Sequence, residues 1–123
     1  MKVYISGPIT GINDYLEKFN NAEEYLTEQG YTVINPAKVN SNLPLDTPHD
    51  SFMEMCYVML DMADSIYMLP GWEKSKGACI EYGYAKAKGY SIMERNVPEA
   101  SDVRYIKRMV VAGKTEIQKG AKQ

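Results

Sequence analysis

Short strand-like runs alternate with helix-like segments along most of this chain. The first run, residues 2–6 (KVYIS), is rich in β-branched and aromatic residues, and residues 14–29 then place apolar side chains at helical spacing. Further strand-like runs cover residues 31–34, 65–69 and 90–93, and further helix-like segments cover residues 50–62 and 78–88. Parallel strands need long connections, so this order predicts an α/β fold with right-handed crossovers. We expect a three-layer, Rossmann-like or flavodoxin-like open parallel sheet of four to five strands, with helices on both faces.

Glycine and proline mark the expected ends of these elements. Gly30 and Gly89 end two of the helices, and Pro70-Gly71 closes the third strand. Asp50 or Ser51 is expected to cap the second helix. Residues 37–50, with two prolines, predict a long loop.

Two glycine-containing loops follow the first and third predicted strands. They are residues 7–11 (GPITG) and residues 71–77 (GWEKSKG). Ligands of open parallel sheets bind outside the carboxyl ends of the strands, so we expect both loops to share one crevice. A glycine turn that leads into a helix presents free backbone N–H groups, which suit an anion. Neither G-x-G-x-x-G nor G-x-x-x-x-G-K-[ST] occurs, which argues against a dinucleotide fingerprint and a P-loop.

Composition limits the domain count and the classes of partner. The chain has 123 residues, 45% of them hydrophobic, which predicts one domain over residues 1–123. A formal net charge of -2 lacks the basic excess typical of nucleic-acid binding. Cys56, Cys79 and the single His49 cannot form a disulfide scaffold or a zinc-ligand pattern, so we expect two buried cysteines, a solvent-facing or capping histidine and no metal. The absence of a long apolar run or leader predicts a cytoplasmic protein without a membrane partner.

Glu81 is the strongest candidate for chemistry. It lies in the segment SKGACIEYGYA, in the first turns of a helix that follows the second glycine loop. A carboxylate there is expected to point into the crevice and to be favoured in its ionised form by the helix dipole. An ionised carboxylate can act as a nucleophile. The alternative is that Glu81 only interacts with the helix end.

Three blocks of sequence together resemble a known family. They are Val3-Tyr4-Ile5-Ser6-Gly7 with Gly11, Asp61 and Asp64 in LDMADSIYML, and Ser75-x-Gly77-x-x-x-Glu81-x-Gly83-x-Ala85. Their order and spacing over residues 2–94 are similar to those of nucleoside 2-deoxyribosyltransferase-like proteins, which include deoxynucleoside 5'-monophosphate N-glycosidases. The resemblance implies that Glu81 attacks C1' of the sugar, that Tyr4 positions Glu81, and that Asp61 contacts the base. We interpret Asp64 as structural.

The resemblance also implies a site for a 5'-phosphate. Transferases that act on free nucleosides have a carboxylate six positions before the glutamate, whereas the monophosphate hydrolases have serine, and this chain has Ser75. Thr10 stands where the hydrolases have arginine, so Lys74, Lys76 or a C-terminal basic residue would have to supply the charge. Trp72 is expected either to stack on a base or to cover the edge of the core. The predicted substrate-binding residues are Ser6, Gly7, Ile9, Gly11, Trp72, Ser75 and Gly77.

Two segments offer contacts with other molecules. From about residue 101 the chain is basic, which predicts a helix and tail that are solvated or that contact a phosphate or a subunit. Residues 52–60 are apolar on more than one helical face, which suits either core methionines or a subunit interface. The resemblance favours a homodimer or a higher homo-oligomer.

The sequence therefore predicts an N-glycosidase that releases the base from a nucleoside or deoxynucleoside 5'-monophosphate without a metal or organic cofactor. A deoxyribosyltransferase that exchanges bases is the first alternative. A protein that binds or sequesters nucleotides without turnover is the second.

Overall fold

The computed structural model describes residues 1–94, and the predicted basic segment from about residue 101 lies outside them. Four strands form one parallel sheet in the order β2-β1-β3-β4: β1 (Lys2–Ser6), β2 (Thr32–Ile34), β3 (Ser65–Met68) and β4 (Ser91–Glu94). The helices are α1 (Tyr15–Glu28), α2 (Pro36–Asn40), α3 (His49–Asp61) and α4 (Lys76–Ala87), with a 3-10 turn, η1 (Trp72–Lys74). The predicted parallel α/β fold is confirmed, with four strands in the described part of the chain.

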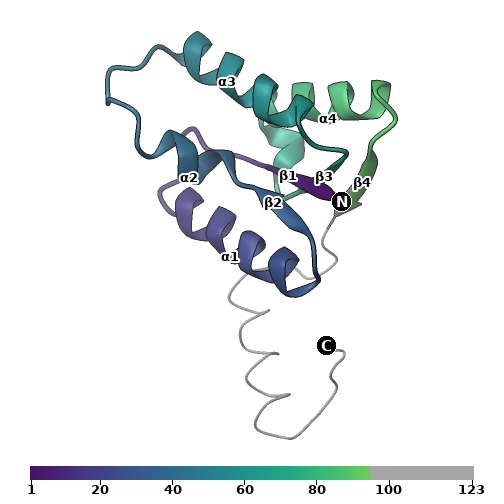
Figure 1. Cartoon of the computed structure of the whole chain (residues 1–123). Helices are drawn as coiled ribbons and strands as arrows, with labels where there is room; N and C mark the ends of the chain where they lie inside the picture. The colour runs from purple at the N-terminus through teal and green to yellow at the C-terminus, as the bar shows by residue number, and fades with distance from the viewer. Residues whose placement is uncertain (95–123) are drawn as a thin grey trace, which may run out of the picture.

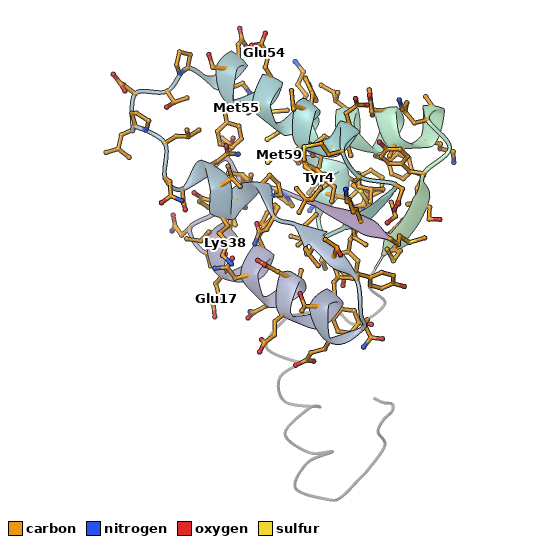
Figure 2. The ribbon with its side chains drawn as sticks, in the orientation of Figure 1. Tyr4, Glu17, Lys38, Glu54, Met55 and Met59 are labelled. Atoms are coloured by element: carbon orange, nitrogen blue, oxygen red, sulfur yellow. The ribbon has the colours of Figure 1, made fainter. Side chains whose placement is uncertain are left out.

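The sheet lies between two layers of helices, and its central strands β1 and β3 are the buried ones. Side chains of β1 point alternately to the two faces, as in any strand. Val3 and Ile5 pack with Phe19 of α1, whereas Tyr4 packs on the opposite face with buried residues of α3 and α4. Figure 1 shows α1 below the sheet and α3 and α4 above it. Figure 2 shows Tyr4 on the strand below α3, while Glu54 lies on the outer side of that helix.

The strand order places a crevice at the carboxyl ends of β1 and β3. From β1 the chain moves outward to β2 and then crosses back to β3 on the other side of β1. The connections therefore diverge between β1 and β3, which is the usual ligand position in open α/β sheets.

Gly7 is needed where these two strands end. The Leu69 amide donates a hydrogen bond of 2.8 Å to the Ser6 carbonyl, so the chains remain close beyond the last paired residues. A Cβ on Gly7 would lie 2.8 Å from the Leu69 Cβ, closer than such atoms approach in proteins.

Two predictions about local structure were wrong. Residues 37–50 are not one long loop, because α2 begins at Pro36 and the Asn35 side chain accepts a hydrogen bond from the Lys38 amide at 3.2 Å. Asparagine as the cap and proline in the first turn are standard helix-start signals. Helix α3 begins at His49, with Pro48 as its cap, and not after Asp50 or Ser51.

The remaining boundaries lie within two residues of the predicted ones, and those of β1 are the same as predicted. Helix α4 starts at Lys76 because Ser75 caps it, two residues before the predicted start.

Cys79 is exposed and only Cys56 is buried, so the prediction for Cys79 was wrong. No helix in residues 1–94 combines the length and apolar character needed to span a membrane.

Candidate active site

Glu81 reaches the sheet because α4 turns one narrow face towards it. Ala78 and Ala85 are the small buried residues of this face, and Glu81 lies between them at helical spacing. Ser75 fixes the start of the helix, because its Oγ accepts a hydrogen bond of 3.2 Å from the Ala78 amide. The Glu81 side chain is therefore buried, with 5% of its surface exposed.

Two hydroxyl groups of β1 hold the Glu81 carboxylate. Tyr4 and Ser6 are two positions apart, so both side chains point to the face of the sheet that α4 covers. The Tyr4 hydroxyl donates to Glu81 Oε2 at 2.6 Å, and the Ser6 Oγ donates to Oε1 at 2.6 Å. Each carboxylate oxygen thus has one short hydrogen bond, which fixes the plane of the group.

Burial dominates the acidity of this carboxyl group. Burial raises the pKa of Glu81, and the hydrogen bonds from Ser6 and Tyr4, which favour the charged form, offset only part of that effect. The helix dipole was expected to favour the ionised form of Glu81, but burial outweighs that effect, because Glu81 lies beyond the first turn and away from water. Burial and the neighbouring Glu81 raise the pKa of Tyr4 well above its usual range, so Tyr4 remains a hydroxyl donor.

Glu81 lies in the wall of a cavity of about 230 Å³, here called the inner cavity. Phe19, Pro36, Phe52 and Met53 provide apolar wall, and Ser6, Thr47, His49 and Cys56 add polar atoms. Glu81 is the one carboxylate among the lining residues that the structure describes. A single buried anion in a largely apolar chamber is suited to stabilise a developing positive charge.

A larger cavity of about 740 Å³, here called the outer cavity, adjoins the inner one. The loop after β1 contributes Pro8 and Thr10, and the loop after β3 contributes Gly71 and Ser75. The two glycine-containing loops therefore share one crevice, as the sequence predicted. Ile9, Thr10, His49, Ser75 and Gly77 line both cavities.

The structure brings together most of the predicted site residues. Tyr4, Ser6, Gly7, Ile9, Ser75, Gly77 and Glu81 all line the inner cavity. Ser6 was predicted to bind substrate, but its hydroxyl donates a hydrogen bond to Glu81. Gly11 is not among the residues that line either cavity, and with a φ of +77° it instead allows the chain to turn.

Trp72 lies away from both cavities. Its ring stacks on Tyr82 of α4, with the ring centres 4.6 Å apart, and it packs against the core on that side. Of the two alternatives drawn from the sequence, the structure places Trp72 over the edge of the core.

Asp61, which the resemblance expects to contact the base, does not lie beside Glu81 within this chain. It is the last residue of α3 and is absent from the lining of both cavities. Its carboxylate accepts a hydrogen bond from the Tyr84 hydroxyl and lies 3.4 Å from Lys88 Nζ. Those partners lie towards the end of α4, whereas the cavities lie near its start. Because Asp61 comes four residues before β3, it lies near the amino end of that strand.

Two residues of the inner cavity were missed as candidates. His49 lines both cavities and stacks on Phe52, with parallel rings 6.4 Å apart. Cys56 lines the inner cavity, and its Sγ accepts a hydrogen bond of 3.5 Å from Asn40 Nδ2. The order of elements could have identified His49. Helix α3 leads back to the amino end of β3, so α3 begins at the opposite edge of the sheet, where the carboxyl ends of the strands lie. His49 is the first residue of α3. Among residues 1–94, no three potential metal-ligating side chains converge.

Comparison with known proteins supports the fold. Residues 1–94 match the model of a family described as a domain of unknown function, DUF4406. A solved structure of a 2-deoxyribosyltransferase from the psychrotolerant bacterium Bacillus psychrosaccharolyticus is similar, with a TM-score of 0.63 and 18% sequence identity over 76% of this chain and 71% of that one. No curated protein sequence matches significantly. At this identity the structural likeness shows a shared fold.

Proposed function

This chain belongs to the DUF4406 family, a domain of unknown function. We propose that the chain hydrolyses the N-glycosidic bond of a nucleoside or deoxynucleoside 5'-monophosphate. The products are the free base and the sugar 5-phosphate. One observation carries the proposal: a buried carboxylate, Glu81, lies in the wall of a cavity with both oxygens held by hydroxyl donors.

Glu81 acts as the nucleophile in two steps. One of its oxygens forms a bond to C1' while the bond from C1' to the base nitrogen breaks, and the base leaves with that electron pair and takes up a proton. A water molecule then attacks C1', the bond from C1' to Glu81 breaks, and the water loses a proton. This is the double-displacement logic of retaining glycosidases.

The surroundings of Glu81 suit this role. The charge that develops on the sugar in the transition state is positive, and Glu81 is the carboxylate of the inner cavity. Burial raises the pKa of Glu81, and a more basic carboxylate is a better nucleophile once ionised. Tyr4 and Ser6 act as positioning residues, because they orient Glu81.

Transfer of the sugar to a second base is the alternative supported by a specific observation. The similar structure is described as a 2-deoxyribosyltransferase. Both reactions share the first step and differ in whether water or another base attacks C1'. A nucleotide-binding protein without turnover would retain the cavity and have no use for an oriented nucleophile.

Product analysis separates these activities. The purified chain is incubated with a panel of nucleoside and deoxynucleoside 5'-monophosphates, with and without an added free base, and the products are separated by chromatography. Free base with sugar phosphate is the expected result, and a swapped base identifies the transferase.

Glu81→Gln keeps the shape of the side chain and removes the nucleophile, so turnover is expected to disappear while binding persists. Mass spectrometry of the protein after rapid quenching is expected to show a sugar-phosphate adduct in the unmodified chain alone. Lys86→Met, at an exposed position near the end of α4, is the matched surface control. Equal turnover in Glu81→Gln and the unmodified chain would overturn the proposal.

A further inference from the structure

We propose that the outer cavity binds the phosphate end of a nucleotide with two or more phosphates at its 5' position, so that nucleoside 5'-diphosphates bind more tightly than monophosphates. This inference rests on the proposed function for the orientation of the ligand, with its base and sugar in the inner cavity. The phosphate-binding property of the outer cavity can be measured separately from turnover.

The outer cavity is positively charged along its walls. Lys18 of α1, Lys74 of η1 and Lys76 of α4 line it, and no aspartate or glutamate occurs among the lining residues that the structure describes. The inner cavity has the opposite character, with Glu81 as its carboxylate. The whole chain has a formal net charge of -2, so the walls of the outer cavity are more positive than the average of the chain.

These lysines are available to a ligand. Within residues 1–94, neither Lys74 nor Lys76 forms a salt bridge. Lys18 lies 3.9 Å from Asp14 in a solvent-exposed pair, which contributes little and is easily exchanged for a stronger anion. Lys18 comes from α1, whereas Lys74 and Lys76 come from the neighbouring ends of η1 and α4, so together these lysines can contact an extended anion.

The start of α4 adds backbone donors to the same cavity. Helix α4 has 12 residues, and its first N–H groups have no acceptor within the helix. Ser75 and Gly77 at this helix start line both cavities. The first phosphate would therefore bind where the two cavities join, and the lysines lie around the space beyond it.

Size and charge favour more than one phosphate. The outer cavity has a volume of about 740 Å³, against about 230 Å³ for the inner cavity that faces Glu81. A phosphate monoester carries about two negative charges at neutral pH. Three lysines and a helix start exceed what one monoester needs, and each added phosphate brings at least one more negative charge to the wider part of the crevice.

Calorimetry on the full-length Glu81→Gln variant tests the inference without interference from turnover. The ligands are the 5'-mono-, di- and triphosphates of one nucleoside, measured without divalent metal at fixed ionic strength. We expect the diphosphate to bind about tenfold more tightly than the monophosphate, equivalent to about 1.4 kcal/mol. Inorganic pyrophosphate alone is expected to compete with the diphosphate. Equal affinity for the three nucleotides, or no binding of any of them, would overturn the inference.

Lysine variants locate the effect. In the Glu81→Gln background, the double substitution Lys74→Met and Lys76→Met is expected to abolish the tighter binding of the diphosphate. The affinity for the monophosphate is expected to fall by a smaller factor than the affinity for the diphosphate. Lys86→Met makes the same chemical change outside both cavities and is expected to retain the tenfold preference. A preference that survives the double substitution would contradict the assignment. Turnover of monophosphates with no diphosphate preference would refute this inference alone, and diphosphate binding without any turnover would refute the proposed function alone.

Discussion

The Tyr4 hydroxyl donates a hydrogen bond of 2.6 Å to Glu81 Oε2, across 77 positions of the sequence. Burial of Glu81 penalises its charged form, and this hydrogen bond works in the opposite direction by stabilising the carboxylate. The pKa of Glu81 therefore depends on a residue of β1.

Tyr4→Phe is expected to shift the pH profile of turnover. Loss of the hydroxyl raises the pKa of Glu81 further, so the acid limb of kcat/KM moves to higher pH. A hydrogen bond to a charged group contributes about 1.5–3 kcal/mol, so kcat/KM on the acid limb should fall roughly tenfold or more. Tyr82→Phe is the control, because that ring stacks on Trp72 outside both cavities. An unchanged acid limb in Tyr4→Phe would show that Tyr4 does not tune Glu81.

Glu81→Gln is expected to stabilise the folded chain at neutral pH. The pKa of Glu81 is raised in the folded state, so its protonated form stabilises the fold at low pH, and this stabilisation is lost as pH rises through the folded pKa. Glutamine keeps the shape without the buried charge. We expect a gain of about 1 kcal/mol at pH 7, or about 4 °C in Tm.

The measurement is Tm against pH for both chains, with the exposed Glu54→Gln as control. The difference between Glu81→Gln and the unmodified chain should shrink towards zero as pH falls below the ordinary carboxyl range. A difference that is constant with pH would mean that packing, and not charge, is responsible.

The fold was largely predictable because its signals are local. Alternating and helical spacing identified all four strands, α1, α3 and α4, and the strand order of such folds placed both glycine loops at one crevice. Helix α2 was missed because Asn35-Pro36 can end a strand as well as start a helix.

The site was predictable only in part. The family resemblance placed Tyr4 beside Glu81, and the two side chains are hydrogen-bonded. The contact of Ser6 with Glu81 was not foreseen, because it depends on the pairing of a strand face with a helix face, which no local pattern specifies. The family resemblance assigned Asp61 to the base, whereas its position four residues before β3 places it near the amino end of that strand and outside the lining of both cavities.

Gly7→Ala is expected to destabilise the chain by about 1–3 kcal/mol, because the added Cβ would lie 2.8 Å from the Leu69 Cβ and neither strand end can move freely. Gly83→Ala is the matched control. Apart from its chain neighbours and the backbone of its own helix, no atom lies within 4 Å of a Cβ at that position in α4, so Gly83→Ala should stabilise the chain by about 0.5–1 kcal/mol through helix propensity. Denaturant unfolding measures both. Equal effects of the two substitutions would show that the approach of Leu69 is not limiting.

Asp61→Asn is expected to leave kcat/KM unchanged within about twofold, since its carboxylate is held by Tyr84 and Lys88 and does not line either cavity. Lys88→Met removes the other partner of this ion pair and is also expected to leave kcat/KM unchanged within about twofold. Steady-state kinetics of the two variants provide the check. A large loss in Asp61→Asn with normal Lys88→Met would mean that Asp61 reaches a substrate in some way that this chain alone does not provide.

Ser75→Asp is expected to separate nucleotides from nucleosides as ligands. Aspartate caps a helix about as well as serine, so the cap on the Ala78 amide and the stability of α4 should be retained. The added carboxylate faces the position expected for a 5'-phosphate, where it repels the phosphate and can accept a hydrogen bond from a free 5'-hydroxyl.

In the Glu81→Gln background, the dissociation constant of a nucleoside 5'-monophosphate should therefore rise roughly tenfold, while that of the matching nucleoside stays constant or falls. Ser75→Ala is the control for the cap: it should lower the stability by about 1 kcal/mol and weaken monophosphate binding less than aspartate does. Calorimetry with both ligands and thermal unfolding of both variants supply the data. If Ser75→Asp weakened nucleoside and nucleotide equally, the phosphate would not lie against the start of α4, because repulsion of an anion cannot act on a neutral ligand.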